Sequence, residues 1–214
     1  AALNLPLGGY DVVLANPPFS GKVDKDRIVD DVKVGTSTAT EILFLKYMID
    51  SLKPGGRCGV IVPEGVLFGS TGAHKELRRQ LIENNTVEAV LSLPGGVFQP
   101  YSGVKTSVLI FRQGGSTDRV LFLHADNDGY KLDANHDTPI DADDLPALVA
   151  TFDDRDALWE DWKKRDEETN WEEKWWFGTM DEIRAKDFDL SAGKFRPQTL
   201  TRSEERRVGN AGRW

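Results

Sequence analysis

The chain has 214 residues, of which 39% are hydrophobic and 29% are charged, and its formal net charge at pH 7 is −8. These values are typical of a globular protein with one domain and an appendage. No apolar run approaches the roughly 20 residues of a membrane helix, and the first residues lack the basic and apolar layout of a signal peptide. We therefore expect a cytoplasmic protein that does not bind membranes.

The acidic character is concentrated in one part of the chain. Residues 141–190 contain 17 Asp and Glu residues against 7 Lys and Arg residues, a net charge of −10, which leaves about +2 for the rest. Because nucleic acid is held mainly through Lys and Arg, any such contact belongs to the first part of the chain or to a partner. The single Cys58 excludes a disulfide framework, and His74, His124 and His136 are too isolated to predict a metal site.

The first predicted element is the strand in "YDVVLANPPFSGK", near the start of the chain. Residues 12–14 form an uninterrupted apolar run, which is typical of a strand covered on both faces of a parallel sheet. Two successive prolines then end the strand, because they remove two backbone donors and fix two φ angles. Asn16 and Phe19 are thereby presented from a stiff segment at the carboxyl end of the strand, where ligands bind in open α/β sheets.

A loop and a helix are predicted next. Residues 20–38 are rich in charge, Gly, Ser and Thr, and loops of this length are usually functional or mobile. Thr38 and Glu41 have capping-box spacing and predict the start of a helix, which the Pro-Gly-Gly run at residues 54–56 should end. The apolar face of this helix consists of Ile42, Leu45, Ile49 and Leu52.

The following elements continue the alternation with a strand at residues 57–63, a helix at 74–85 and a strand at 87–94. Such an order predicts right-handed parallel crossovers. No helix precedes the next strand, at residues 104–112, so it must return antiparallel onto the sheet. With one more strand at 119–125, the sequence predicts half of an α/β sheet with an antiparallel hairpin near its end.

The pattern changes after residue 125, and we predict the domain division there. Residues 126–200 indicate one or two acidic amphipathic helices, up to about Trp176, then a short helix and an extended closing segment. Residues 201–214 have no apolar period and predict a disordered tail. The region is rich in tryptophan; these rings either cover a core or anchor a partner subunit, and both interpretations stay open for Trp159, Trp162, Trp171, Trp175 and Trp176.

The Asn-Pro-Pro-Phe turn suits methyl transfer to a planar nitrogen. The exocyclic amine of a nucleobase is a poor nucleophile, because its lone pair is conjugated into the ring. If its N–H groups donate to the Asn16 side chain and the Pro17 carbonyl, the nitrogen can direct a lone pair at a methyl donor, and Pro17 and Pro18 hold both acceptors in place. The ring of Phe19 can stack on a base flipped from its duplex.

The motif and the sequence that follows it resemble one protein family. "VLANPPF" resembles the motif of adenine-N6 DNA methyltransferases. "FLKYMIDSLKPGGRCGVIVPEGVLF", "LRRQLIENNTVEAVLSLPGGVF", "GVKTSVLIF" and "EIRAKDFDLSAGKFRP" are similar to the modification subunit of type I restriction-modification systems, and the resemblance spans about residues 10–197. It implies a Rossmann-like methyltransferase sheet, S-adenosylmethionine as cofactor, N6-methyladenine in DNA as product and a bacterial or archaeal source. It also implies partners: a specificity subunit, a second modification subunit and a restriction subunit.

One departure from the family concerns the cofactor. The family carries a glycine-rich loop and an acidic residue upstream of its Asn-Pro-Pro-Phe motif, whereas only nine residues precede Tyr10 here. We interpret the chain as the carboxyl-terminal half of such a subunit. Alone, it should be inactive and lack most of the cofactor site, with Asn16 as the one cofactor-binding candidate, and its sheet should have an open edge.

Other residues are weaker candidates for substrate binding. Pro63 and Glu64 end the second strand beside the motif and either line the same cleft or simply terminate the strand. Phe98 and Tyr101, in the glycine-rich loop after the third strand, either contact the flipped base or DNA or pack within the loop. The last group lies in the long loop and either touches phosphate or is only solvated: Lys22, Lys25 and Arg27.

Two other functions remain open from the residues. The same polarisation works on any planar nitrogen, so the chain could belong to an RNA or protein N-methyltransferase with this motif. It could also be a truncated module that assembles with partners without catalysis. Cofactor binding and analysis of the methylated product distinguish these alternatives.

Overall fold

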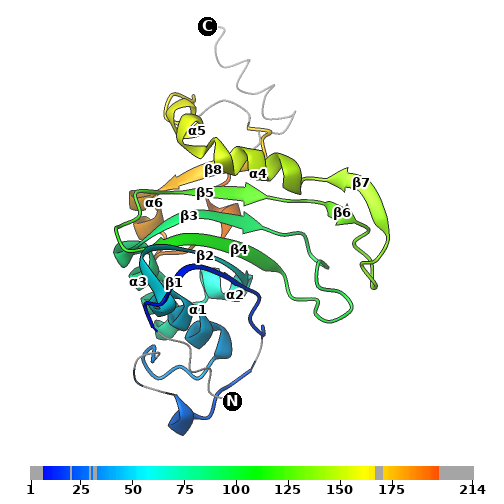
Figure 1. The fold of residues 1–214 in the computed structure, drawn as a ribbon. Coiled ribbons are helices and arrows are strands. Elements are labelled where there is room, and N and C mark those ends of the chain that lie inside the picture. Colours follow the sequence, from blue (N-terminus) through cyan, green and yellow to red (C-terminus); the bar gives the residue numbers. More distant parts are fainter. Residues whose placement is uncertain (1–6, 20, 29, 31–32, 167–170, 198–214) are drawn as a thin grey trace, which may run out of the picture.

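A mixed six-stranded sheet forms the centre of the computed structural model, which describes residues 7–19, 21–28, 30, 33–166 and 171–197. The strands are ordered β1-β2-β4-β3-β5-β8 from one edge to the other (Figure 1). Their bounds are Tyr10–Ala15 for β1, Leu52–Pro63 for β2, Asn85–Ser92 for β3, Thr106–Gln113 for β4, Arg119–His124 for β5 and Trp175–Thr179 for β8. The predicted α/β class with a Rossmann-like sheet is confirmed.

The strand directions agree with the sequence pattern. β1 runs parallel to β2, and β3 runs parallel to β5, with Ala15 opposite Val60 and Val90 opposite Phe122. β4 is antiparallel to both β2 and β3, which confirms the predicted hairpin. Because β4 lies between β2 and β3, the hairpin occupies the interior of the sheet.

Helices α1 (Thr40–Ser51) and α3 (Gly72–Asn84) pack against β2 and β3. The predicted apolar face of the first helix is confirmed for Ile42, Leu45 and Ile49, whereas Leu52 begins β2. The buried face of α3 carries Leu77, Leu81 and Ile82, and all six of these helix side chains are at most 8% exposed. Two short helices, α2 (Glu64–Phe68) and α6 (Met180–Ala185), and two 3₁₀ turns, Lys25–Arg27 and Ala192–Lys194, complete this part of the fold. α6 confirms the predicted short helix near the end of the chain, whereas α2 was not predicted.

The predicted bounds of the first helix are wrong at both ends. The N-cap is Ala39, without a side-chain cap, because the Thr38 carbonyl accepts a bond from the Val23 N–H at 2.9 Å and holds this segment extended. At the other end the helix stops at Ser51, and residues 53–56 lie in a bulge of β2. A Cβ on Gly56 would come within 2.9 Å of the Tyr10 carbonyl oxygen, so glycine is required there.

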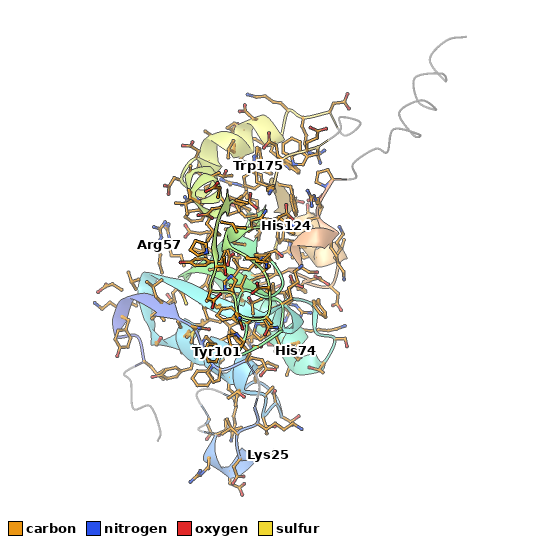
Figure 2. All side chains as sticks on the ribbon, turned by 90° about the vertical axis from the view of Figure 1, so that its right-hand side faces the viewer. Lys25, Arg57, His74, Tyr101, His124 and Trp175 are labelled. Atoms are coloured by element: carbon orange, nitrogen blue, oxygen red, sulfur yellow. The ribbon has the colours of Figure 1, made fainter. Side chains whose placement is uncertain are left out.

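The strand β1 lies at one edge of the sheet, and the prediction that its apolar run is covered on both faces is wrong. Val12 is 62% exposed and Leu14 is 82% exposed. The helices α1 and α3 cover the side of the sheet that carries Cys58, and alternation places Leu14 and Arg57 on the other side. Figure 2 shows Arg57 on one side of the molecule and His74, which lies on α3, on the other.

The acidic helices predicted after residue 125 are α4 (Leu145–Asp153) and α5 (Arg155–Trp162), which pack on β5 and β8. A small hairpin of β6 (Asp128–Tyr130) and β7 (Pro139–Asp143) projects from this end of the sheet (Figure 1). The predicted helix around Trp175 and Trp176 is wrong. These residues lie in β8, because Trp176 pairs with Phe122 and its indole N–H donates to the Ala192 carbonyl at 3.0 Å.

The tryptophans mainly cover a core. Trp162 is 8% exposed, and its ring centroid lies 5.0 Å from that of Trp171 and 6.1 Å from that of Trp175. Trp159 contacts Phe177 edge-on at 5.2 Å. The alternative role as a partner interface stays a prediction for the half-buried rings.

Some predictions are not tested by this structure. The predicted disordered tail lies outside the described residues. The division at residue 125 stays a prediction, although β8 joins the sheet formed by the earlier strands. Within the described part of the chain, no helix is long and apolar enough to cross a membrane, and no three His, Cys, Asp or Glu side chains are grouped to hold a metal ion.

Candidate active site

The Asn-Pro-Pro-Phe turn directly follows β1. Pairing with β2 ends at Ala15, opposite Val60, because the two prolines that follow Asn16 have no N–H to donate. Asn16 and Pro18 are exposed, whereas Pro17 and Phe19 are half-buried. The asparagine amide is therefore accessible at the carboxyl end of the strand, as predicted.

A second turn lies at the same edge of the sheet, because β1 and β2 are parallel. Pro63 is buried and is the N-cap residue of α2, and Glu64 begins the helix. One carboxylate oxygen of Glu64 accepts from the Ser92 hydroxyl at 3.2 Å and lies 3.2 Å from the Lys105 ammonium. The prediction that Pro63 and Glu64 end a strand beside the motif is confirmed in position, and their role in a cleft stays a prediction.

The loop 93–105 connects β3 to β4 and reaches this edge, because an antiparallel strand begins where its neighbour ends. The ring centroids of Phe98 and Phe19 are 4.9 Å apart, with the rings inclined at 76°. The structure therefore brings together two aromatic candidates that are 79 positions apart in the sequence. Edge-to-face pairs of this kind contribute about 0.5–1.5 kcal/mol beyond the area they bury.

Two residues of this edge were not identified from the sequence. Lys105 forms the ion pair with Glu64, and its backbone carbonyl accepts from the Glu64 N–H at 3.0 Å. Ser92, which is buried, donates to the same carboxylate. Both residues lie in the segments that resemble the family, "AVLSLPGG" and "GVKTSVLIF", but only the pairing of β4 with both β2 and β3 places them beside Glu64.

A shallow hollow of about 430 Å³ lies on the open side of the sheet, beside the motif. Its lining is mostly apolar: Leu14, Ala15, Asn16, Gly59, Ile61 and Val108. None of these residues is acidic, so the hollow offers an apolar wall with one amide and no carboxylate for the hydroxyl groups of a ribose. Its residues thus match only a small part of what a nucleoside cofactor needs.

The remaining candidates are the exposed cations of the long loop. Lys22, Lys25 and Arg27 are exposed, and Figure 2 shows Lys25 at the tip of the long loop, well apart from Tyr101. Burial raises the pKa of the Cys58 thiol to about 12, which argues against a role as nucleophile.

Comparisons with known proteins agree with the resemblance found in the sequence. A family model described as N-6 DNA Methylase matches residues 6–204. The chain is 32% identical, over 194 residues, to the EcoEI methylase subunit of a type I restriction enzyme from Escherichia coli, a match that covers 88% of this chain and 38% of that subunit. The chain therefore spans less than half the length of this relative.

Solved structures give the same result. The chain superimposes with a TM-score of 0.70 and 32% identity on a structure from a study of complex assembly in the type I R-M system, covering 95% of this chain and 42% of that one. A type I methyltransferase subunit from Streptococcus thermophilus, at 21% identity and a TM-score of 0.69 over 93% of this chain and 40% of that one, shares the fold. The chain thus belongs to the N-6 DNA methylase family and is similar to the methylase subunits of type I restriction enzymes.

Proposed function

We propose that the chain is the base-binding part of a type I modification subunit, which transfers a methyl group from S-adenosylmethionine to N6 of adenine in DNA. The observation that carries the proposal is the placement of the Asn-Pro-Pro-Phe turn at the carboxyl edge of the sheet, with Phe19 in contact with Phe98. Family membership supports the same activity.

Asn16 and Pro17 act on the amine in this proposal. The Asn16 side-chain oxygen and the Pro17 carbonyl each accept a hydrogen bond from one N–H group of the adenine amine, so that its nitrogen approaches tetrahedral geometry and directs a lone pair at the methyl group. Pro18 keeps the turn stiff, and the acceptors therefore need little reorganisation during the reaction. Removal of one such preorganised partner typically lowers the rate by about 100- to 1000-fold.

Phe19 provides the ring on which the base stacks, and in the absence of a base Phe98 occupies part of that surface. A base that stacks on Phe19 replaces the ring contact with Phe98 by a base contact, which is worth about 1–3 kcal/mol against about 0.5–1.5 kcal/mol for the aromatic pair. The exchange is therefore favourable once a base leaves its duplex. Pro63 and Glu64 border the same space from the neighbouring turn.

The cofactor is only partly accommodated by this chain. When bound, S-adenosylmethionine supplies the electrophilic methyl group. Asn16 and the apolar hollow beside it would form one wall of its pocket, while the described residues around the hollow contain no acidic side chain for the ribose. We therefore assign the glycine-rich loop and the acidic ligand to other parts of the subunit, and we expect residues 1–214 alone to be inactive.

Assembly with other subunits follows from the same proposal. Relatives are named as methylase subunits of type I restriction enzymes, which supports association with a specificity subunit, a second modification subunit and a restriction subunit. The net charge of −8 is consistent with target reading by a partner, since the 35 acidic residues outnumber the 27 Lys and Arg residues and their excess opposes binding to the DNA backbone. The cytoplasmic location stays a prediction.

The proposal is tested on the full coding sequence, coexpressed with any adjacent specificity gene. The purified complex is incubated with labelled S-adenosylmethionine and mixed-sequence DNA, and the DNA is digested to nucleosides. We expect label in N6-methyldeoxyadenosine, a loss of at least about 100-fold in Asn16→Ala, and wild-type activity in the control Asn135→Ala, which alters an exposed asparagine on the β6–β7 hairpin.

Other outcomes would favour the alternatives. Cofactor binding without label in DNA, but with label in RNA or protein, would indicate another N-methyltransferase. No cofactor binding by the complete complex would favour a non-catalytic assembly module.

A further inference from the structure

Tyr101 is the most exposed large hydrophobic side chain in the part of the chain that the structure describes, with 94% of its surface accessible. A single exposed aromatic ring is not unusual on a protein surface. This one is notable for its place, because it lies in the loop 93–105, three positions after the ring that contacts the Asn-Pro-Pro-Phe turn.

The loop holds Tyr101 in a defined position. The Gln99 N–H donates to the Gly96 carbonyl at 3.0 Å, and the Ser102 N–H donates to the Phe98 carbonyl at 2.9 Å, so Tyr101 lies within a closed turn. Lys105 also ties the far end of the loop to Glu64 at 3.2 Å. Neither these hydrogen bonds nor the ion pair involves Phe19, so they hold the turn when a base replaces Phe98 at that ring. One aromatic ring of the loop thus packs on the motif while the next projects into solvent at the same edge of the sheet.

The charge of the loop suits an approach to DNA. In a chain with a net charge of −8, residues 93–105 contain no acidic residue and one lysine, Lys105. Phosphate repulsion therefore does not oppose entry of this loop, although it would oppose the acidic segment 141–190.

Base flipping creates a gap that such a ring can fill. When adenine leaves the helix, its two stacking neighbours and its pairing partner lose contacts, and a rigid aromatic side chain recovers part of that stacking, about 1–3 kcal/mol for each base contacted. Tyrosine has few rotatable bonds, so little conformational entropy is lost when its ring is inserted.

We propose that Tyr101 inserts into the DNA base stack at the gap left by the flipped adenine and so keeps the base at Phe19. This inference rests on the proposed function. Tyr101 is a positioning residue here, since it contacts the neighbours of the target base and not the reacting amine.

The test uses the complete modification complex after the labelled product has identified the target adenine. Methylation is measured on a matched duplex and on a duplex with an abasic site opposite the target, where flipping breaks no base pair. For Tyr101→Ala we expect kcat/KM to fall at least about 10-fold on the matched duplex and less than about 3-fold on the abasic one. Tyr101→Phe should retain wild-type values on both, because the ring and not the hydroxyl fills the gap.

A matched control and a direct readout accompany these rates. Tyr130→Ala removes another exposed tyrosine, on the β6–β7 hairpin, and should leave both substrates unaffected. With 2-aminopurine at the target position, the wild-type complex should show the fluorescence increase of an unstacked base, and Tyr101→Ala should show a smaller one.

Several results would overturn the inference while leaving the proposed function intact. These are an unchanged rate on the matched duplex, an equal loss on both duplexes, or a loss that size-exclusion chromatography traces to failed subunit assembly. Absence of methylated DNA from the wild-type complex would instead contradict the proposed function itself.

Discussion

The two ends of the central sheet differ in how their faces are covered. At the β5–β8 end, α4 and α5 cover one face and the closing segment packs on the other, so Leu121, Phe122, Trp176 and Phe177 are at most 3% exposed. At the β1 edge, the described residues cover only the face toward α1, and Leu14 is 82% exposed. The turns that carry the candidate site all project from the less covered half.

The β5–β8 end therefore acts as a rigid scaffold, whereas the β1 edge carries the turns of the candidate site. Trp176 and Phe177 pack tightly against their neighbours, and such packing resists any change of shape. The turns at the β1 edge are held by a few directional contacts, such as the Phe19–Phe98 pair and the Glu64–Lys105 ion pair. Contacts of this kind can be exchanged for contacts with a base or a cofactor at little cost to the fold.

The largest expected change in stability comes from removing one apolar side chain from each end of the sheet. Trp176→Ala should lower the free energy of unfolding by about 3–5 kcal/mol, because it leaves a cavity in a region that cannot collapse around it. Leu14→Ala, the matched control at the edge, should change it by less than about 0.5 kcal/mol. Urea unfolding followed by far-UV circular dichroism measures both, and similar values for the two variants would show that the ends do not differ.

A second test changes an ion-pair cluster that joins the two halves of the sheet. One oxygen of the buried Glu88 carboxylate accepts from Arg57 at 3.1 Å, Arg112 at 3.0 Å and Arg155 at 3.3 Å, which joins β2, β4 and α5. Glu88→Gln should destabilise the fold by about 1–3 kcal/mol, less than a fully buried pair, because Arg57 and Arg112 are about half exposed.

The control for this test is Glu83→Gln, which removes an i,i+4 pair with Arg79 on the surface of α3 and should cost about 0.5 kcal/mol or less. Added salt should restore part of the stability of Glu88→Gln, because it screens repulsion among the three guanidinium groups. A stable Glu88→Gln protein would indicate that the halves are joined by packing alone.

The smallest expected effect concerns the link between β5 and α4. The Lys174 ammonium hydrogen bonds Asp126 and lowers the pKa of that carboxyl below its ordinary 3.8. For Asp144, burial acts to raise the pKa, but bonds from Lys174 and two backbone N–H groups outweigh it and the pKa is lowered as well. A carboxyl whose pKa is lowered by folding stabilises the protein above its unfolded pKa, and this contribution is lost as pH falls through the folded pKa.

Lys174→Met should therefore lower the free energy of unfolding at pH 7 by roughly 1 kcal/mol or less, because Asp126 is 54% exposed. The difference between variant and wild type should shrink below about pH 4, where both carboxyls become protonated. Thermal unfolding across this pH range tests the assignment, and a difference that does not change with pH would contradict it.

The elements that the sequence predicted well are those whose pattern is local and matches their burial. The face of α3 repeats every three to four residues, and the prolines after β1 end the strand without help from the rest of the fold. The Asn-Pro-Pro-Phe turn was identified on the same basis, since its chemistry resides in adjacent residues.

The errors arose where distant partners decide the structure. Residues 12–14 have the pattern of a buried strand, but no described element covers the outer side of Leu14. Trp176 follows acidic helices, and only its pairing with Phe122 places it in a strand. Likewise, nothing local to Lys105 indicates that Glu64, 41 positions earlier, is its partner.

The position of β4 has a consequence for the exchange of backbone hydrogens with solvent. β4 is hydrogen-bonded to strands on both sides, whereas β1 has a neighbour on one side only within the residues that the structure describes. Amides of β4 therefore exchange only when the whole sheet opens, and those of β1 exchange by local fraying. In deuterium labelling, β4 acts as an internal reference for global unfolding, and a molecule that completes the sheet edge slows exchange in β1 alone.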